Sequence, residues 1–228
     1  MKTVKQAIWV ISLGLVYMAG MNNALAGSQF IYVGVAPTYS MTNFDWTVED
    51  TKENIINNTQ NNTQIGVMVG YGVLINRIYI GVEGATQFGE RTAASQTHDV
   101  DTGEPLSNKV TMSDIYVVDF RPGYVLNGKN SLIYGIVGVN SSTFQAKQTN
   151  SAGEVVQDSD SDRSHGIRLG AGYNLGLGRH FMARVEYVFT TFSTIEFSDN
   201  DNDNQTQSWK LKPYSNEINV GLAVVFNL

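Results

Sequence analysis

The sequence predicts an all-β protein, an eight-stranded antiparallel up-and-down transmembrane β-barrel. Three observations favour this fold. Eight segments alternate large apolar residues with small or polar ones, as β-strands do. The connections between the segments are alternately short and long, and each segment has one apolar face and one face of glycines and charges. An antiparallel meander closed into a barrel accounts for all three observations.

The first 26 residues precede these segments and have the pattern of a secretory signal peptide. Lys2 and Lys5 form the basic start, residues 7–20 the apolar middle, and residues 24–26 a small-residue cleavage site. The apolar middle is shorter than the roughly 20 residues of a spanning helix, so cleavage is expected and the barrel domain is 27–228. Removing both lysines lowers Lys+Arg from 15 to 13 against 21 Asp+Glu, a net charge of -8. This acidic balance argues against a nucleic-acid binder.

The eight periodic segments are each long enough for the about 9–11 residues of a tilted membrane strand. They cover residues 30–41, 63–73, 78–88, 110–125, 132–145, 165–175, 181–192 and 215–228. Eight strands can close into a barrel whose interior is just filled by side chains. Because the sequence contains no cysteine, its stability has to come from topology and packing rather than from disulfides.

The connections differ sharply in length and composition. Short ones lie at 74–77, 127–130 and 176–179, and the last two contain the glycine and asparagine that tight hairpin turns require. Four polar stretches of about twenty residues lie between them, at 42–62, 89–109, 146–164 and 193–214. We expect these four stretches to be long loops on the extracellular side.

The two faces of the segments differ in chemistry. One face is almost purely apolar, with residues such as Val67, Val118 and Val220. The other face combines many glycines with seven charges: Glu83, Asp119, Arg121, Arg168, Arg184, Glu186 and Glu217. Three arginines and four acids leave a net charge of -1, so the charges on this face nearly balance.

Two architectures fit this alternation: a soluble periplasmic barrel with the apolar face inside, or a membrane barrel with that face against lipid. Eight strands of bulky apolar residues would overfill so narrow a lumen, and aromatic residues gather near the strand ends as in membrane girdles. Three arginines facing lipid would cost roughly 6–12 kcal/mol. We therefore expect a membrane barrel in which Asp119 and Arg121 point inward.

Several short motifs make the resemblance more specific. Gly-Val-Glu-Gly at 81–84, Asp-Phe-Arg-Pro-Gly-Tyr at 119–124, Arg-Val-Glu-Tyr at 184–187 and the apolar C-terminal strand resemble the small Gram-negative outer-membrane β-barrels, the OmpA-like and opacity-protein-like porin family. The resemblance implies a cell outer membrane location, contact with outer-membrane lipid and lipopolysaccharide, and insertion by the outer-membrane assembly machinery. It also implies that the seven inward charges form an ionic network that plugs the lumen. Members commonly end on an aromatic residue, whereas this chain ends on Leu228.

The sequence gives little support for catalysis or metal binding. The histidines, His98, His165 and His180, fall in places that this topology keeps apart, and the adjacent Ser164 and His165 would point to opposite faces of a strand. Acidic runs at 158–162 and 199–203 begin like calcium loops but lack the glycine at position six and the acid at position twelve. We expect no catalytic site, no metal and no cofactor.

Function is therefore expected in the long polar stretches. Trp46 and Trp209 are candidate contact residues there, or equally girdle residues. The leading interpretation is a non-enzymatic surface protein with a role in envelope structure, adhesion or surface antigenicity, which could bind a host or surface ligand. The alternatives are a small pore and, with less support from the sequence, a lipid-modifying enzyme or a soluble periplasmic barrel.

Overall fold

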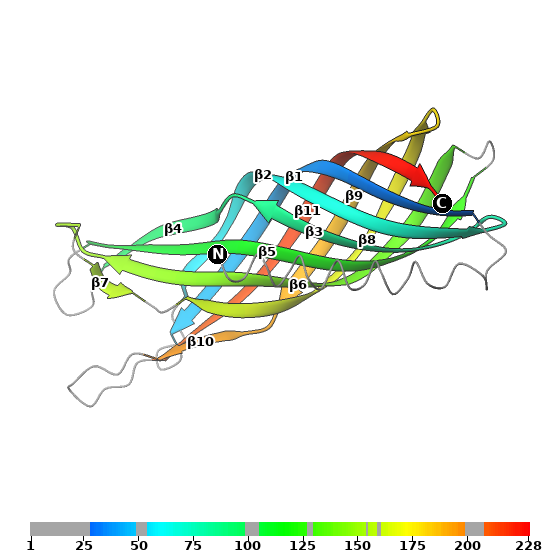
Figure 1. The fold of residues 1–228 in the computed structure, drawn as a ribbon. Helices are drawn as coiled ribbons and strands as arrows, with labels where there is room; N and C mark the ends of the chain where they lie inside the picture. The colour runs from blue at the N-terminus through cyan, green and yellow to red at the C-terminus, as the bar shows by residue number, and fades with distance from the viewer. Residues whose placement is uncertain are drawn as a thin grey trace.

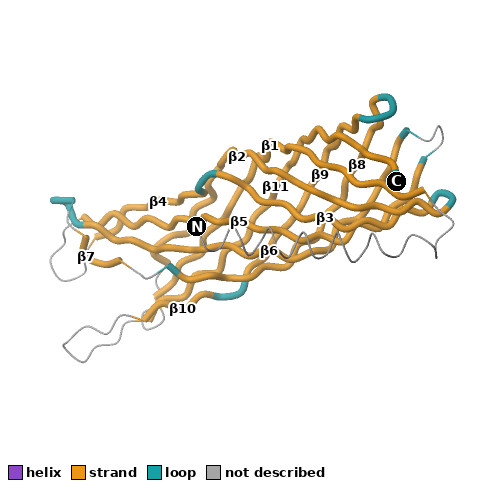
Figure 2. Tube along the Cα trace, viewed as in Figure 1, coloured by secondary structure: helices purple, strands orange, loops and turns teal. Residues whose placement is uncertain are grey.

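The computed structural model describes residues 28–48, 54–98, 105–126, 130–153, 155–158, 161–198 and 208–228, and the predicted signal peptide lies outside them. The ordered elements in this part are strands (Figures 1 and 2). They are β1 Ser28–Val48, β2 Asn54–Ile75, β3 Ile78–Phe88, β4 Arg91–His98, β5 Pro105–Val125, β6 Ser131–Thr149, β7 Val155–Asp158, β8 Asp162–Leu177, β9 Phe181–Phe192, β10 Ile195–Ser198 and β11 Ser208–Asn227. The described residues contain no helix long and apolar enough to cross a membrane.

The strands close into a ring of eight. Each neighbouring pair is antiparallel, and the ring is completed by β5 with β6 and by β1 with β11. Three ring strands are interrupted: β3 and β4 both pair with β5, β7 and β8 both pair with β6, and β9 and β10 both pair with β11. The predicted eight-stranded antiparallel barrel is therefore confirmed.

Tight turns join the strands at one rim. Asn76, in the turn between β2 and β3, has a φ of 57°, and Gly178, between β8 and β9, has a φ of 81°. Asparagine and glycine tolerate this left-handed conformation best. The amide of Leu228 donates to the carbonyl oxygen of Gln29 at 3.0 Å, so both ends of the described barrel lie at this rim.

The prediction that the four long polar stretches are loops is wrong for much of their length. β1 continues to Val48, β2 begins at Asn54, β4 and the first part of β5 lie within 89–109, and β11 begins at Ser208. Figure 1 shows β4, β7 and β10 at the end of the barrel far from the C-terminus. Backbone pairing satisfies the peptide groups there. In β4, β5 and β6 apolar inward residues such as Ala93, Val110 and Ala146 alternate with polar outward ones such as Lys109. A polar composition therefore marked a water-facing wall rather than loops.

A bulge in β5 changes which residues face inward. The pairing of β5 with β6 shifts between Ser113 and Tyr116, and Asp114 has a φ of 49°. Before the bulge Met112 is buried, and after it Ile115 is buried, so the inward positions move from even to odd numbers. The extra residue lets one strand point apolar side chains inward both above and below the bulge.

The two faces of the middle part of the barrel lie as predicted for a membrane protein. Val118, Ile167 and Leu222 are more than half exposed, whereas Asp119 and Arg121 are almost completely buried. A soluble barrel with the apolar face inside would have the opposite arrangement. Lipid is the solvent that makes such an apolar outer surface favourable.

Candidate functional site in the barrel interior

Eight charged side chains are buried inside the barrel among the described residues. Seven of them are the predicted inward charges, and the eighth is Arg91. We call this set the charged belt: Glu83, Arg91, Asp119, Arg121, Arg168, Arg184, Glu186 and Glu217. Four arginines face four acids, so the belt is electrically neutral. Neutrality matters here because an unpaired charge in a dry interior costs several kcal/mol.

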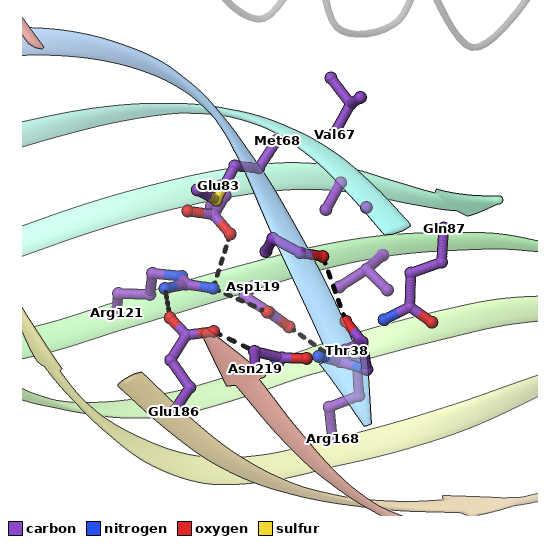
Figure 3. Close-up of a pocket in the computed structure, with 14 residues that line it drawn as sticks. Thr38, Val67, Met68, Glu83, Gln87, Asp119, Arg121, Arg168, Glu186 and Asn219 are labelled. Carbon is purple, nitrogen blue, oxygen red and sulfur yellow. Dashed lines mark hydrogen bonds and ion pairs between the residues drawn. The ribbon is translucent and has the colours of Figure 1, made fainter. Parts of the chain in front are cut away.

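Arg121 of β5 is the hub of one half of the belt (Figure 3). Its Nη2 lies 2.7 Å from Glu83 Oε1 and 3.3 Å from Asp119 Oδ2, and its Nη1 donates to Glu186. Arg184 contacts two of these acids, with Nη1 2.6 Å from Glu83 Oε2 and 3.4 Å from Glu186 Oε1. Five of the ring strands send charges to the lumen, namely β3 with β4, β5, β8, β9 and β11, and the hub joins β3 and β9 across it.

The other half of the belt extends the chain of alternating charges. Arg168 Nε lies 3.1 Å from Asp119 Oδ1, and its Nη1 lies 3.2 Å from Glu217 Oε2. Glu217 Oε1 in turn lies 2.8 Å from Arg91 Nη2. Arg91 also donates to Gln64 Oε1 at 2.7 Å and Gln87 Oε1 at 2.6 Å. The belt is therefore one connected network rather than separate pairs.

Tyrosines complete the network on the side of the short turns. Tyr32 Oη donates to Glu83 at 2.7 Å, and Tyr134 Oη donates to Glu186 at 2.6 Å. The Arg184 guanidinium lies 5.1 Å from the centre of the Tyr32 ring, and that of Arg121 lies 5.4 Å from the Tyr134 ring. These rings fill the lumen and add cation–π attraction to the ion pairs.

Inward glycines make room for these large side chains. A Cβ at Gly138 would overlap the Asp119 carboxylate, and one at Gly172 would overlap the Tyr134 ring. Glycine weakens a strand, so its presence here is explained by close packing against a neighbouring side chain. The alternation of glycine with charge in the sequence is thus a size match within a narrow barrel.

A second layer fills the lumen beyond the belt, on the side far from the short turns. This upper apolar core consists of Phe44, Ala93, Val110, Met112, Ile115, Val117, Phe144, Ala146, Phe192, Ile195 and Leu211. The rings of Phe144 and Phe192 meet edge to face, with centroids 5.2 Å apart. Its members come from strands on all sides of the ring, so they close the lumen as the core of a soluble protein would.

A small void lies beside the belt among the described residues. It has a volume of about 30 Å³ and is lined by residues that include Glu83, Asp119, Arg168 and Asn219. A space of this size suits one water molecule rather than a continuous channel. Nε of Arg121 and Oδ1 of Asn219, two residues that line the void, have no hydrogen-bond partner in the protein, so they are the polar groups that such a water could serve.

Arg91 is the belt residue that sequence reasoning missed. It follows Gly89, whose φ of 111° interrupts the strand between β3 and β4, and it lay in a stretch read as a loop. The seven predicted inward charges summed to -1, and this missing positive charge was the available signal that another inward cation exists. Glu217, which is completely buried, needed a second cation, and Arg91 supplies it.

Among the other residues considered from sequence, those whose side chains the structure describes do not come together in a site. Ser164 is buried and His165 is exposed, on opposite faces of β8, and His180 lies in a short turn. Among the described residues no group of three or more His, Cys, Asp or Glu could hold a metal ion. Residues 199–203 and 159–160 lie outside the described part. The backbones of Trp46 and Trp209 lie in β1 and β11, but their side chains are likewise outside it.

Comparisons with solved structures agree with this fold. The chain is similar to OprG of Pseudomonas aeruginosa, with 15% identity, a TM-score of 0.55, and 87% of this chain and 96% of that chain covered. It is similar to a major outer membrane protein of Thermus thermophilus, with 10% identity, a TM-score of 0.55, and 87% and 99% covered. Ail, the attachment invasion locus protein of Yersinia pestis, solved with the heparin analogue sucrose octasulfate, has 14% identity, a TM-score of 0.46, and 89% and 100% covered.

No curated protein sequence matches the chain. A family model does: the outer membrane protein beta-barrel domain matches residues 11–226, almost the whole chain. The closed ring of eight strands, the apolar outer band and the buried charges agree with that match. The chain belongs to the outer membrane protein β-barrel domain family of the Gram-negative outer membrane.

Proposed function

We propose that the protein is a non-enzymatic surface protein of the outer membrane, in which a closed barrel carries rigid hairpins into the extracellular space. The observation that carries this proposal is the filled lumen. Tyrosines, the charged belt and the upper apolar core occupy it in succession. A barrel filled in this way serves better as a scaffold than as a passage, so the contact surface belongs to the hairpins.

The hairpins have the features of a platform rather than of mobile loops. Where β4, β5 and β6 rise beyond the apolar band, their inward residues pack in the upper apolar core. Their outward residues are polar, for example Thr92, Lys109 and Gln145. A fixed polar wall can present the same groups to a partner without ordering them on binding, which favours affinity. The proposal assigns a role in adhesion, envelope structure or surface antigenicity to this wall.

Three kinds of partner follow from this proposal. Outer-membrane lipid and lipopolysaccharide contact the apolar band and the wall above it. The outer-membrane assembly machinery inserts the barrel. A host or surface ligand meets the hairpin tips, where Trp46 and Trp209 remain candidate contact residues. Both termini would then lie in the periplasm, with the short turns.

Trimmed barrels test the proposal. Residues 46–56, 95–108, 148–157 and 197–209 would be replaced one by one with two-residue turns, which leaves the charged belt and the upper apolar core in place. Assembly would be checked by the mobility of the unheated barrel in a denaturing gel. We expect at least one trimmed barrel that assembles normally to lose cell adhesion or envelope resistance to detergent. Assembled barrels with all four stretches trimmed and both properties unchanged would refute the proposal.

A small pore is the second candidate, and the void beside the belt favours it. Opening the ion pairs of Arg121 would enlarge that void, and a continuous passage would also require the upper apolar core to separate. Planar-bilayer recordings test this alternative with Arg121→Ala beside the unchanged protein. A steady current that rises in the variant would support a gated pore. No current in the variant or in the unchanged protein would contradict the pore and support the closed scaffold.

A further inference from the structure

An apolar groove lies on the outer face of the barrel, within the lipid-facing band, and the proposed function assigns no specific ligand to it. It crosses β5, β6, β8 and β9 and has a volume of about 790 Å³. Its floor is a cross-strand row of small side chains, Pro122, Gly135 and Ala171. The neighbouring row nearer the short turns forms one wall, from Tyr124 through Ile133 and Tyr173 to Val185, and Tyr187 closes the end of the floor.

The packing of the barrel does not explain the glycine in this floor. A Cβ built at Gly135 would meet only Pro122 Cγ, at 4.0 Å, so a side chain would fit without strain. At Gly172, one row away but facing inward, a Cβ would overlap the Tyr134 ring. Glycine weakens a strand and normally has a packing reason. For Gly135 that reason lies outside the barrel, in the space it leaves open.

The proline in the floor points the same way. Pro122 has no backbone N–H to donate. The β5–β6 register is the same at Phe120 with Val137 and at Gly123 with Tyr134, so Pro122 lies opposite Gly135, but these two residues are not paired. Proline inside a paired strand is unfavourable. Two residues that weaken the ladder thus face each other at the floor, and both present little side chain outward.

The chemistry of the groove suits one acyl chain and one phosphate. The walls are apolar and lie within the lipid-facing band, where Ile133 and Val185 are about half exposed. The volume lies within the roughly 300–1,000 Å³ of ordinary ligand pockets. At the end nearest the short turns, the Tyr124 hydroxyl accepts a hydrogen bond from Arg77 Nη1 at 3.4 Å. Arg77 is exposed in the turn between β2 and β3, and a guanidinium there suits a phosphate.

We propose that this groove is a binding site for a phospholipid of the leaflet on the side of the short turns. One acyl chain lies over Pro122, Gly135 and Ala171, and the headgroup phosphate meets Arg77. Charge complementarity and the leaflet position commit the site to this occupant rather than to a second copy of the chain. The lipid would cover the weakened contact between β5 and β6.

Native mass spectrometry of the intact barrel, released from vesicles of phosphatidylethanolamine and phosphatidylglycerol, tests the proposal. The unchanged protein should retain one phospholipid. Gly135→Leu should lower that retention at least tenfold by filling the groove, and Arg77→Gln should lower it several-fold. The matched control is Val35→Leu, which adds one methylene to an outward side chain on the opposite part of the ring. Equal retention in Gly135→Leu and the control would overturn the proposal.

A second measurement keeps the proposal testable if Gly135→Leu does not fold. A phospholipid with a photoreactive group on its acyl chain should label peptides of β5, β6 and β8 in the unchanged barrel several-fold more than peptides of β1 and β2. Even labelling around the barrel would overturn the proposal. So would a dimer of the unchanged barrel that Gly135→Leu splits, because the groove would then be an interface between copies.

Discussion

The lower and upper parts of the barrel use the same alternating strands in opposite ways. In the lower part Val118 faces out to lipid and its neighbour Asp119 faces into the charged belt. In the upper part of the same strand Val110 faces into the apolar core and Lys109 faces out to water. The solvent on the outside has changed, and the chemistry of both faces has changed with it. The alternation of apolar and polar residues therefore shows which face of a strand points inward only when the solvent outside that part of the barrel is known.

The interiors of the two parts also differ in what holds them together. The belt consists of charges that have to be matched, since each removed partner leaves a buried charge behind. The upper core consists of apolar side chains whose loss leaves a cavity. Substitutions in the two parts are therefore expected to destabilise the barrel for different reasons and to lower its free energy of unfolding by different amounts.

The largest effect is expected from Glu217→Ala. Glu217 pairs with both Arg91 and Arg168, so its loss leaves two guanidinium groups in a buried site. We expect a loss of about 5 kcal/mol in the free energy of unfolding, at the upper end of the cost of breaking a buried pair. Urea unfolding of the barrel from lipid vesicles measures it. Glu90→Ala, which removes an exposed acid, is the control and should change little; equal effects would contradict the belt.

A smaller effect is expected in the upper apolar core. Leu211 is completely buried there, and Leu211→Ala should lower the free energy of unfolding by about 2–5 kcal/mol through lost burial and a cavity. Lys212→Ala, one residue away and exposed, is the matched control and should lie within about 0.5 kcal/mol of the unchanged protein. If both substitutions were neutral, this part of the chain would be a loop and not a packed wall.

The outer faces of the lower and upper parts should also differ in how well they tolerate an added charge. Val118→Arg places a cation on the lipid-facing band and should destabilise the barrel by about 2–4 kcal/mol. Thr111→Arg, on the outer face of the same strand above the bulge, faces water and should cost less than about 0.5 kcal/mol. Vesicle-based unfolding of both variants compares them directly, and similar costs would contradict the change of solvent along β5.

The lower part could be predicted from sequence to a far greater extent than the upper part. Around Asp119 and Arg121 the period of two is unbroken, and the cost of arginine in lipid decided which face turned inward. Above it, Asp114 shifts the register through a bulge, and Gly89 breaks the strand before Arg91. The many polar outward residues there made the apolar inward ones hard to recognise in the sequence, because a polar composition is expected both of a loop and of a water-facing wall.

The groove at Gly135 was also beyond reach from sequence. An outward glycine in a strand looks like any other glycine until the register shows that Pro122 lies beside it. Inward glycines could be read as a group because charges alternate with them. A single outward glycine can be interpreted only when the residues beside it on the neighbouring strands are known.

Single-cysteine labelling along β5 tests the inversion of the barrel wall most directly, because the chain has no cysteine of its own. Intact cells that carry Lys109→Cys, Val110→Cys, Thr111→Cys, Met112→Cys, Val118→Cys or Phe120→Cys would be treated with a water-soluble maleimide that does not cross the outer membrane. We expect labelling at 109 and 111 and protection at 110, 112, 118 and 120. Equal labelling at 109–112 would show a loop instead of a wall, and labelling at 118 and 120 would place the apolar face in water; either result would contradict the account.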